Sequence, residues 1–240
     1  MNKTLAITLA VLVIFGAAGI GLYSFMTSPT KGPSLVANTP SKPAPVEQKP
    51  VELSTAPAEN MGEGAFRIDA ASSKASFSIF EMLRGEPKTV IGTTTNISGE
   101  FVVDMDDLAS AKLGTIYINA RTFSTDSSQR DNTTRRAILK TEDDANEFIV
   151  FKATDIDGLP TSTATGTALI YSITGDLTIS GVTKPAVFNG SGTFNSENEF
   201  AGTASTTVKR SDFNLIVPSL PFLADVADEV PLTIEFVAKR

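Results

Sequence analysis

Apolar and polar residues alternate through most of the chain after residue 64. In the stretch GDLTISGVTKPAVF, residues 175–188, apolar side chains recur at every second position on both sides of a Ser-Gly pair. Successive side chains of a strand point to opposite faces of its sheet, so this period predicts strands with one buried face. The pattern therefore predicts an all-β fold for the domain.

Segments of this kind occur throughout the domain. The predicted strands lie within FSIF (77–80), ISGEFVVD (97–104), LGTIYINARTF (113–123), EFIVFKA (147–153), TALIYSITGDLTIS (167–180), AVFNGSGTF (186–194), FAGTASTTVKR (200–210) and VPLTIEFVA (230–238). No strand–helix repeat accompanies them, which argues against a doubly wound fold. Glycines in these segments, among them Gly99, Gly175 and Gly190, favour a closed antiparallel barrel over a sandwich, because barrel corners need sharp bends.

One stretch between the strands lacks the alternation. Residues 130–144, RDNTTRRAILKTEDD, open with residue types that cap helices and continue with good helix formers. The sequence therefore predicts one short helix inserted between strands.

The chain before residue 64 predicts a membrane anchor and a tether. Residues 5–26 form an uncharged run of 22 residues, long enough to cross a hydrocarbon core of about 30 Å. A cleaved signal peptide is the alternative for residues 1–26, although no clean cleavage site follows the run. Residues 27–63 hold seven of the 13 prolines and predict a disordered linker. We therefore expect a single-pass membrane protein whose domain, residues 64–240, is exported to the periplasmic or extracellular side, or a secreted protein if the segment is cleaved.

The residue types that are missing exclude several kinds of chemistry. The chain has no Cys, His or Trp, so it lacks the ligands of most transition-metal sites and the base of His-dependent triads. Its net charge of −7 and its scattered basic residues argue against a nucleic-acid partner. The acidic stretch DMDD, residues 104–107, lacks the spacing of a calcium loop and predicts a turn. We expect no enzyme, no cofactor and no metal; a hydrolase built on two converging carboxylates ranks last among the alternatives.

Four blocks in the expected order resemble a known family. The stretch GDLTISGVTKPAVF resembles the G-x-L-T-I-x-G-V-T-K-P-V signature of the YceI-like, lipocalin-like family of exported polyisoprenoid-binding proteins. INARTFSTDSSQRDNTTRRAIL is similar to the family's Arg-Asp block, VKRSDFNL to its R-x-D-F-G block, and VADEVPLTIEFVAKR to its closing strand. Asn214 stands where the family usually has Gly.

The resemblance, over about residues 65–240, implies an eight-stranded antiparallel lipocalin-like barrel with one short helix, holding an isoprenoid chain. The interior of such a barrel is just wide enough for a small ligand, and each buried CH₂ contributes about 0.8 kcal/mol, so an apolar lining suffices. The predicted ligand-binding residues are Phe77, Ile79, Phe101, Val103, Ile116, Ile118, Phe151, Leu177, Ile179, Phe188, Phe213 and Phe236. Four polar residues are candidates either for orienting a head group or for bracing the barrel ends through ion pairs and caps: Arg130, Asp131, Arg210 and Asp212.

These observations predict a membrane-tethered, non-catalytic protein that binds a long isoprenoid-type lipid in order to sequester or transport it. The alternative is a tethered structural or adhesion module whose barrel core is solid. The sequence leaves the oligomeric state open, a homodimer included.

Overall fold

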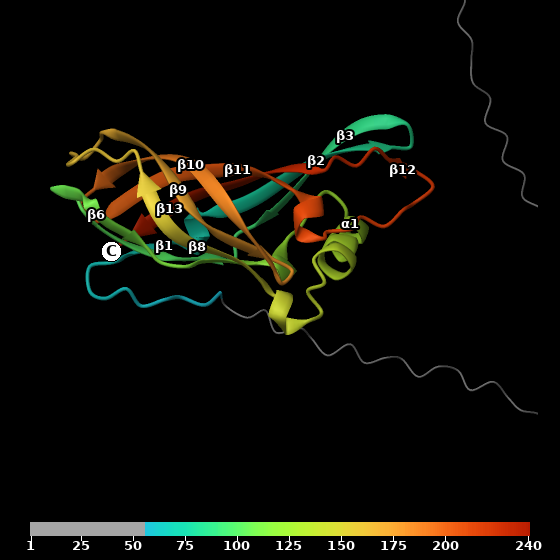
Figure 1. Ribbon diagram of the computed structural model, residues 1–240, viewed down its shortest axis with the longest axis horizontal. Helices are drawn as coiled ribbons and strands as arrows, with labels where there is room; N and C mark the ends of the chain where they lie inside the picture. The colour runs from blue at the N-terminus through green and yellow to red at the C-terminus, as the bar shows by residue number, and fades with distance from the viewer. Residues whose placement is uncertain (1–55) are drawn as a thin grey trace, which may run out of the picture. The chain divides into compact units, whose positions relative to one another are not determined.

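The computed structural model describes residues 56–240, which form one curled antiparallel sheet with a short helix beside it (Figure 1). The sheet contains thirteen strands: β1 (Phe66–Ile68), β2 (Lys74–Leu83), β3 (Glu86–Thr94), β4 (Ile97–Ser98), β5 (Glu100–Asp104), β6 (Asp107–Leu113), β7 (Ile116–Asn119), β8 (Phe148–Asp157), β9 (Ala168–Ile179), β10 (Val182–Ser196), β11 (Glu199–Lys209), β12 (Leu223–Ala224) and β13 (Glu229–Lys239). The prediction of an all-β fold is confirmed.

The order of the strands explains the curl. They follow the order β4-β7-β8-β9-β10-β11-β13-β1-β5-β6, and β2 pairs with β3, β12 and β13. One residue, Gly99, separates β4, which pairs with β7, from β5, which pairs with β1. The N–H of Ile68 also donates to the carbonyl of Gly99 at 3.0 Å. The first strand of this order, β4, and the second-last, β5, are thus joined by one short stretch of chain.

The hairpin of β9 and β10 contains the sequence that most resembles the family signature. Ser180 and Gly181 connect the two strands, both with positive φ (47° and 76°), as the two-residue turns that suit the twist of a hairpin require. The sequence also predicts that Gly181 and Pro185 break the ladder between Ile179 and Val187, with the proline at an edge position. Instead Pro185 lies within β10 opposite Asp176. A proline is tolerated there because pairing of β10 with β11 begins only at Asn189, which leaves the other side of β10 unpaired.

The predicted short helix is present but shifted. The α-helix α1 (Ser128–Asn132) continues directly into a π-helical stretch, Thr133–Ile138. The helical stretch does not reach residue 144, because Lys140 adopts a left-handed conformation with φ of 53°. The carboxylate of Asp131 accepts hydrogen bonds from both the N–H (2.6 Å) and the hydroxyl (2.7 Å) of Thr125, which ties the helix to the preceding loop.

Residues 56–63, at the end of the predicted linker, lie against the sheet near β4, β5 and the β6–β7 turn. The carboxylate of Glu59 accepts from the hydroxyl (2.6 Å) and the N–H (3.0 Å) of Thr115. The N–H of Met61 donates to the Glu100 carboxylate at 3.0 Å, which also accepts from Arg67 at 2.8 Å. We call residues 56–63 the strap.

The predicted strands are present, but several of their first and last residues differ from the prediction. Each of the eight predicted segments contains a strand. Strands β1, β3 and β12 were not predicted, and only the last residue of β6 falls within a predicted segment. The DMDD stretch forms the turn between β5 and β6, as predicted. The predicted membrane anchor and most of the predicted linker lie outside the described residues. Within residues 56–240, no helix has the length and apolarity that a membrane crossing requires.

Candidate functional site

Two cavities lie along the inner face of the curled sheet. A small cavity of about 120 Å³ lies toward β6, and a large cavity of about 550 Å³ lies toward α1, β3 and β12, at the other end of the sheet in Figure 1. Ligand sites of proteins are mostly apolar hollows of roughly 300–1,000 Å³, so the large cavity alone falls within their range.

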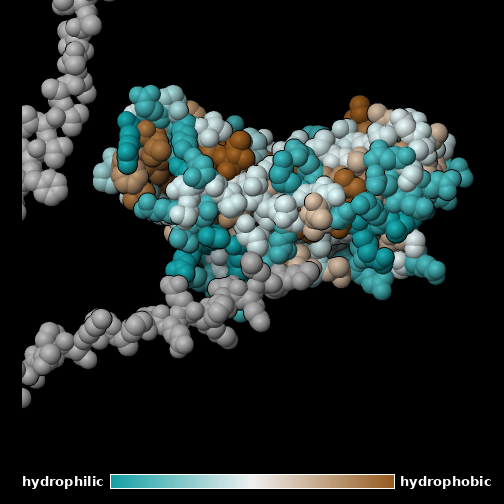
Figure 2. Space-filling view, turned by 180° about the vertical axis from the view of Figure 1, so that it is seen from behind, coloured by the Kyte–Doolittle hydropathy of each residue, from teal (hydrophilic) through white to brown (hydrophobic). Residues whose placement is uncertain are grey.

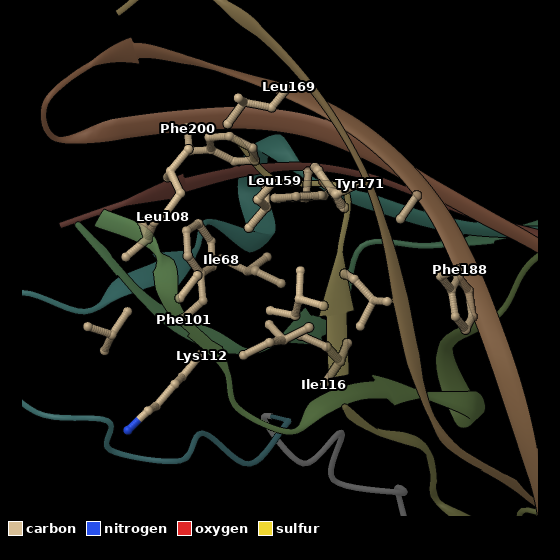
Figure 3. A pocket seen from close by; sticks show the side chains of 18 of the residues that line it. Ile68, Phe101, Leu108, Lys112, Ile116, Leu159, Leu169, Tyr171, Phe188 and Phe200 are labelled. Atoms are coloured by element: carbon tan, nitrogen blue, oxygen red, sulfur yellow. The ribbon is translucent and has the colours of Figure 1, made fainter. Parts of the chain in front are cut away.

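The small cavity is almost wholly apolar. It is lined by Ile68, Phe101, Val102, Val103, Leu108, Ala111, Lys112, Leu113, Ile116, Phe151, Ile156, Leu159, Leu169, Tyr171, Ile173, Phe188, Phe194, Phe200, Ala204, Ile234 and Phe236. Figure 3 shows the one charged member, Lys112, directing its amino group away from the apolar side chains. Burial raises the pKa of the Tyr171 hydroxyl to about 12, because the anion would lose its hydration. The small cavity is therefore a poor environment for a charged group.

The large cavity combines an apolar wall with polar groups. It is lined by Phe77, Ile79, Glu81, Leu83, Arg84, Glu86, Val90, Phe123, Ser127, Gln129, Arg130, Thr133, Thr134, Ile138, Leu139, Ile149, Ile179, Val208, Arg210, Leu215, Val217, Leu220, Phe222, Leu223, Val226, Val230 and Leu232. The polar members come chiefly from α1, the π-helical stretch and the β2–β3 hairpin. The apolar members come chiefly from the strands and from the chain between β11 and β13.

The two cavities share the same strand faces. Along β13, every second residue points inward: Val230 and Leu232 line the large cavity, and Ile234 and Phe236 line the small one. In the wall of the small cavity, the Phe151 and Phe188 rings pack edge to face with centroids 4.9 Å apart. The cavities are therefore two parts of one apolar interior, arranged along the strands.

A buried ion pair stands in the wall of the large cavity. Arg130 donates to Glu81 at 3.1 Å, and both side chains are largely buried. Arg130 also pairs with Asp126, whose pKa is held below its usual value chiefly by the hydrogen bond from Lys88. Arg130 is thus held between two carboxylates in a fixed position.

Arg210 is held by the chain after β11. Its guanidinium donates to the carbonyls of Ala227 (3.1 Å) and Leu215 (3.2 Å) and lies 3.9 Å from Asp228. The pKa of Asp228 is lowered, first by the hydroxyl of Ser211, which donates to it at 2.6 Å. These contacts tie the two ends of the segment between β11 and β13 together.

The structure distributes the sequence-predicted residues over both cavities. Six of the predicted apolar residues line the small cavity: Phe101, Val103, Ile116, Phe151, Phe188 and Phe236. Three line the large cavity: Phe77, Ile79 and Ile179. Leu177 and Phe213 are buried in the adjoining core, and Ile118 packs against that core, so none of these three lines either cavity. Of the polar candidates, Arg130 and Arg210 line the large cavity, whereas Asp131 and Asp212 do not.

Sequence reasoning missed several lining residues. Leu169, Tyr171 and Ile173 share the parity of Leu177 and Ile179 on β9, so the alternation itself was a signal for them. Leu220 and Phe222 belong to an irregular segment with Pro218 and Pro221, where no period exists to predict which side chains face inward. Within residues 56–240, no group of three or more His, Cys, Asp or Glu side chains is placed to hold a metal ion.

A curled antiparallel sheet around an apolar interior, with a short helix at one end, defines a half-barrel class of all-β domain. The chain belongs to the family of YceI-like domains, whose model matches residues 66–238. No curated protein matches the chain significantly.

Solved structures share this fold at low sequence identity. The chain is similar to BcnA of Burkholderia cenocepacia, with 21% identity and a TM-score of 0.55 over 72% of this chain and 99% of that one. It is also similar to a polyisoprenoid-binding domain from Saccharophagus degradans implicated in plant cell wall breakdown, with 15% identity and a TM-score of 0.56 over 72% of this chain and 97% of that one.

Proposed function

We propose that this domain binds a long apolar lipid of the isoprenoid type inside its curled sheet, without catalysis, in order to sequester or transport it. The observation that carries the proposal is the pair of apolar cavities aligned along the same strand faces. The similarity in fold to the polyisoprenoid-binding domain from Saccharophagus degradans supports the isoprenoid class of ligand.

The lining accounts for affinity without a charged anchor. Each buried CH₂ contributes about 0.8 kcal/mol, so one five-carbon isoprene unit contributes roughly 4 kcal/mol before ordering costs. A branched polyene chain also matches the rings and branched side chains of the wall in polarity. A few isoprene units within the large cavity are sufficient for binding.

We further propose that the sheet acts as a closed lipocalin-like barrel around this lipid. Support comes from the chain on either side of Gly99, where β4 pairs with β7 and β5 pairs with β1. Closure would leave the end formed by α1, β3 and β12 as the mouth. The tether and exported location expected from residues 1–63 complete the proposal of a membrane-tethered carrier.

The competing function, a structural module with a solid core, is disfavoured by the large cavity. Its volume of about 550 Å³ is far above that of the occasional voids of packed interiors, few of which exceed a water molecule. An empty apolar hollow of this size costs stability, because its wall lacks contacts on one side. A bound apolar guest would supply those contacts.

Two tryptophan substitutions on β11 test the proposal. Val208 lines the large cavity, whereas its neighbour Thr207 is exposed on the opposite face. In the full-length chain, Val208→Trp places an indole in the cavity, and Thr207→Trp places the same group in solvent. Because the natural chain has no Trp, the emission of each variant reports the surroundings of that one side chain.

The expected result is that native mass spectrometry finds a bound polyprenol on the natural chain and on the Thr207→Trp variant. The Val208→Trp variant, with blue-shifted emission, should bind at least about tenfold more weakly, equivalent to about 1.4 kcal/mol. A natural chain that neither carries nor takes up a long polyprenol, or equal uptake by both variants, would contradict the proposal.

A further inference from the structure

We propose that the rim of the large cavity docks onto a phospholipid bilayer. The apolar rim consists of Ile216, Leu220 and Phe222, all from the segment between β11 and β12. This surface goes beyond the proposed ligand site, and it does not depend on which apolar ligand the cavity takes.

The large apolar side chains of the rim are unusually exposed to solvent. Ile216 is 73% exposed, Phe222 44% and Leu220 37%, and Leu220 and Phe222 also line the large cavity. Phe80, 44% exposed, lies beside the chain that follows β12, since its carbonyl accepts a hydrogen bond from Ala227 at 2.9 Å. Figure 2 shows hydrophobic surface gathered at this end of the molecule, between hydrophilic borders. The inner wall of the cavity thus continues outward onto the surface.

The rim is held in place by backbone pairing. Leu223 and Ala224 of β12 pair with β2, and the N–H of Arg84 donates to the carbonyl of Phe222 at 2.7 Å. The N–H of Leu223 also donates to the carbonyl of Leu220 at 3.0 Å, so Leu220 and Phe222 are presented from a hydrogen-bonded backbone. Such exposure of large apolar groups around an opening is typical of an interaction site.

Arginine side chains lie near the apolar rim. Arg84, at the β2–β3 turn, is exposed and makes no ion pair with any residue in the described part of the chain. Arg84 and Arg210 line the same cavity. Of the cavity's two carboxylates, Glu81 is already paired with Arg130, whereas Glu86 is exposed at the start of β3. Apolar side chains beside arginines match the boundary of a bilayer, where acyl chains lie next to phosphate groups.

The size of the rim favours a bilayer over a protein partner. A specific protein interface takes about 20–30 residues on each side, and three or four exposed apolar side chains fall well short of that. Shallow insertion into a bilayer, by about 5–10 Å, needs only a few such side chains. The same chain also carries the uncharged run 5–26, which is predicted to lie in a membrane and to tether the domain within its reach.

Docking at this rim gives an apolar ligand a continuous path. A long hydrocarbon loses about 0.8 kcal/mol for each CH₂ that must cross water, so free diffusion from a membrane into the cavity is very slow. When the rim touches acyl chains, the ligand moves from one apolar phase to another. The net charge of −7 disfavours strongly anionic membranes, so we assign the rim to a zwitterionic surface.

Fluorescent labels on the full-length chain test the docking. Because the chain has no Cys, Ile216→Cys and Ile170→Cys each provide one labelling site for an environment-sensitive fluorophore. Ile170 is 77% exposed but lies on β9 between Leu169 and Tyr171, which line the small cavity, so it is a matched control away from the rim. After reconstitution into phosphatidylcholine vesicles, the label at position 216 should shift to the blue and be quenched by brominated acyl chains at least about twofold more than the label at position 170.

A charge at the rim separates docking from ligand binding. Ile216 does not line the cavity, so Ile216→Asp should leave polyprenol uptake from detergent micelles unchanged and slow uptake from phosphatidylcholine vesicles about tenfold. A label at position 216 that stays in water, a chain that does not associate with the vesicles, or equal quenching at both positions would overturn the docking. None of these three results depends on whether the chain binds polyprenol from micelles. The docking proposal can therefore fail while the ligand-binding proposal stands, and the reverse.

Discussion

Tyr171 lies directly over Gly190 on the neighbouring strand, so close that a Cβ at Gly190 would stand 2.2 Å from Cε2 of the ring. The same arrangement recurs where Phe77 covers Gly92 and Phe200 covers Gly192. In each case the missing side chain leaves room for an aromatic ring within the curl of the sheet. These glycines therefore allow the rings to pack against the backbone and keep the interior apolar.

Substitution of Gly190 should test this packing. Gly190→Ala should lower the free energy of unfolding by about 1–3 kcal/mol, because the ring or the strand must move. In the Tyr171→Leu background the same change should cost much less, since the clash is gone. Urea unfolding of the natural chain, the two single variants and the double variant measures the coupling free energy between the two positions. Purely additive losses would contradict the close packing.

The stability of the domain should fall at alkaline pH because of Tyr171. Burial raises the pKa of Tyr171 from 10.0 to about 12, so the folded state holds its proton more tightly than the unfolded state. This contribution is fully present below pH 10 and is lost as the pH rises to about 12, at up to about 1.4 kcal/mol per pH unit. Urea unfolding across this range should show a shallower alkaline decline for Tyr171→Phe, and identical slopes would count against the assignment.

The Glu81–Arg130 pair should matter more than an exposed pair. Glu81→Gln leaves Arg130 largely buried with only Asp126 as an ionic partner, so we expect a loss of about 1–3 kcal/mol in unfolding free energy. The Lys74–Glu235 pair, at 2.9 Å, is about half exposed on both sides, and Glu235→Gln should cost less than about 1 kcal/mol. Equal losses in thermal or urea unfolding would mean that burial does not strengthen the pair.

The strap should loosen in acid. The pKa of Glu59 is lowered, chiefly by the hydroxyl of Thr115, so its contacts hold above the ordinary value of 4.5 and are lost as the pH falls through the lower folded value. The Thr115 amide should therefore lose protection against hydrogen exchange in acid, once the exchange rates are corrected for the pH dependence of intrinsic exchange. Glu59→Gln should abolish this pH dependence, and protection unchanged by acid in the natural chain would contradict it.

Local patterns predicted much of the fold. The alternation identified the long strands, and the Ser180–Gly181 pair identified the turn between β9 and β10, because both signals depend on neighbouring residues. Strand β3 was missed because Pro87 and Gly92 interrupt a polar, threonine-rich segment. Among the described strands it pairs with β2 alone, apart from an isolated bridge at Thr93. Its position is set by tertiary pairing, which one segment does not encode alone.

The site was less predictable than the fold. Parity placed Phe101 and Phe236 on the inner face, yet Leu177, with the same parity as the lining residue Ile179, is buried in the core and lines neither cavity. The difference depends on where a residue lies along the interior, a property of the assembled sheet. Asn214, in the position where glycine is usual, adopts φ of 54°, a conformation that Asn tolerates better than most residues.

The register of β13 limits how this domain can change in length. Its inward residues line first the large cavity and then the small cavity. Thr233 and Glu235, which alternate with them along the strand, face outward beside β2 and β11. Deleting one residue at the middle of β13 would exchange inner and outer side chains over half of the strand and turn a carboxylate into the hydrocarbon compartment. Length variants of this protein should therefore accumulate in hairpin loops or arise as two-residue steps, which makes the spacing from Val230 to Phe236 a criterion for recognising functional homologues.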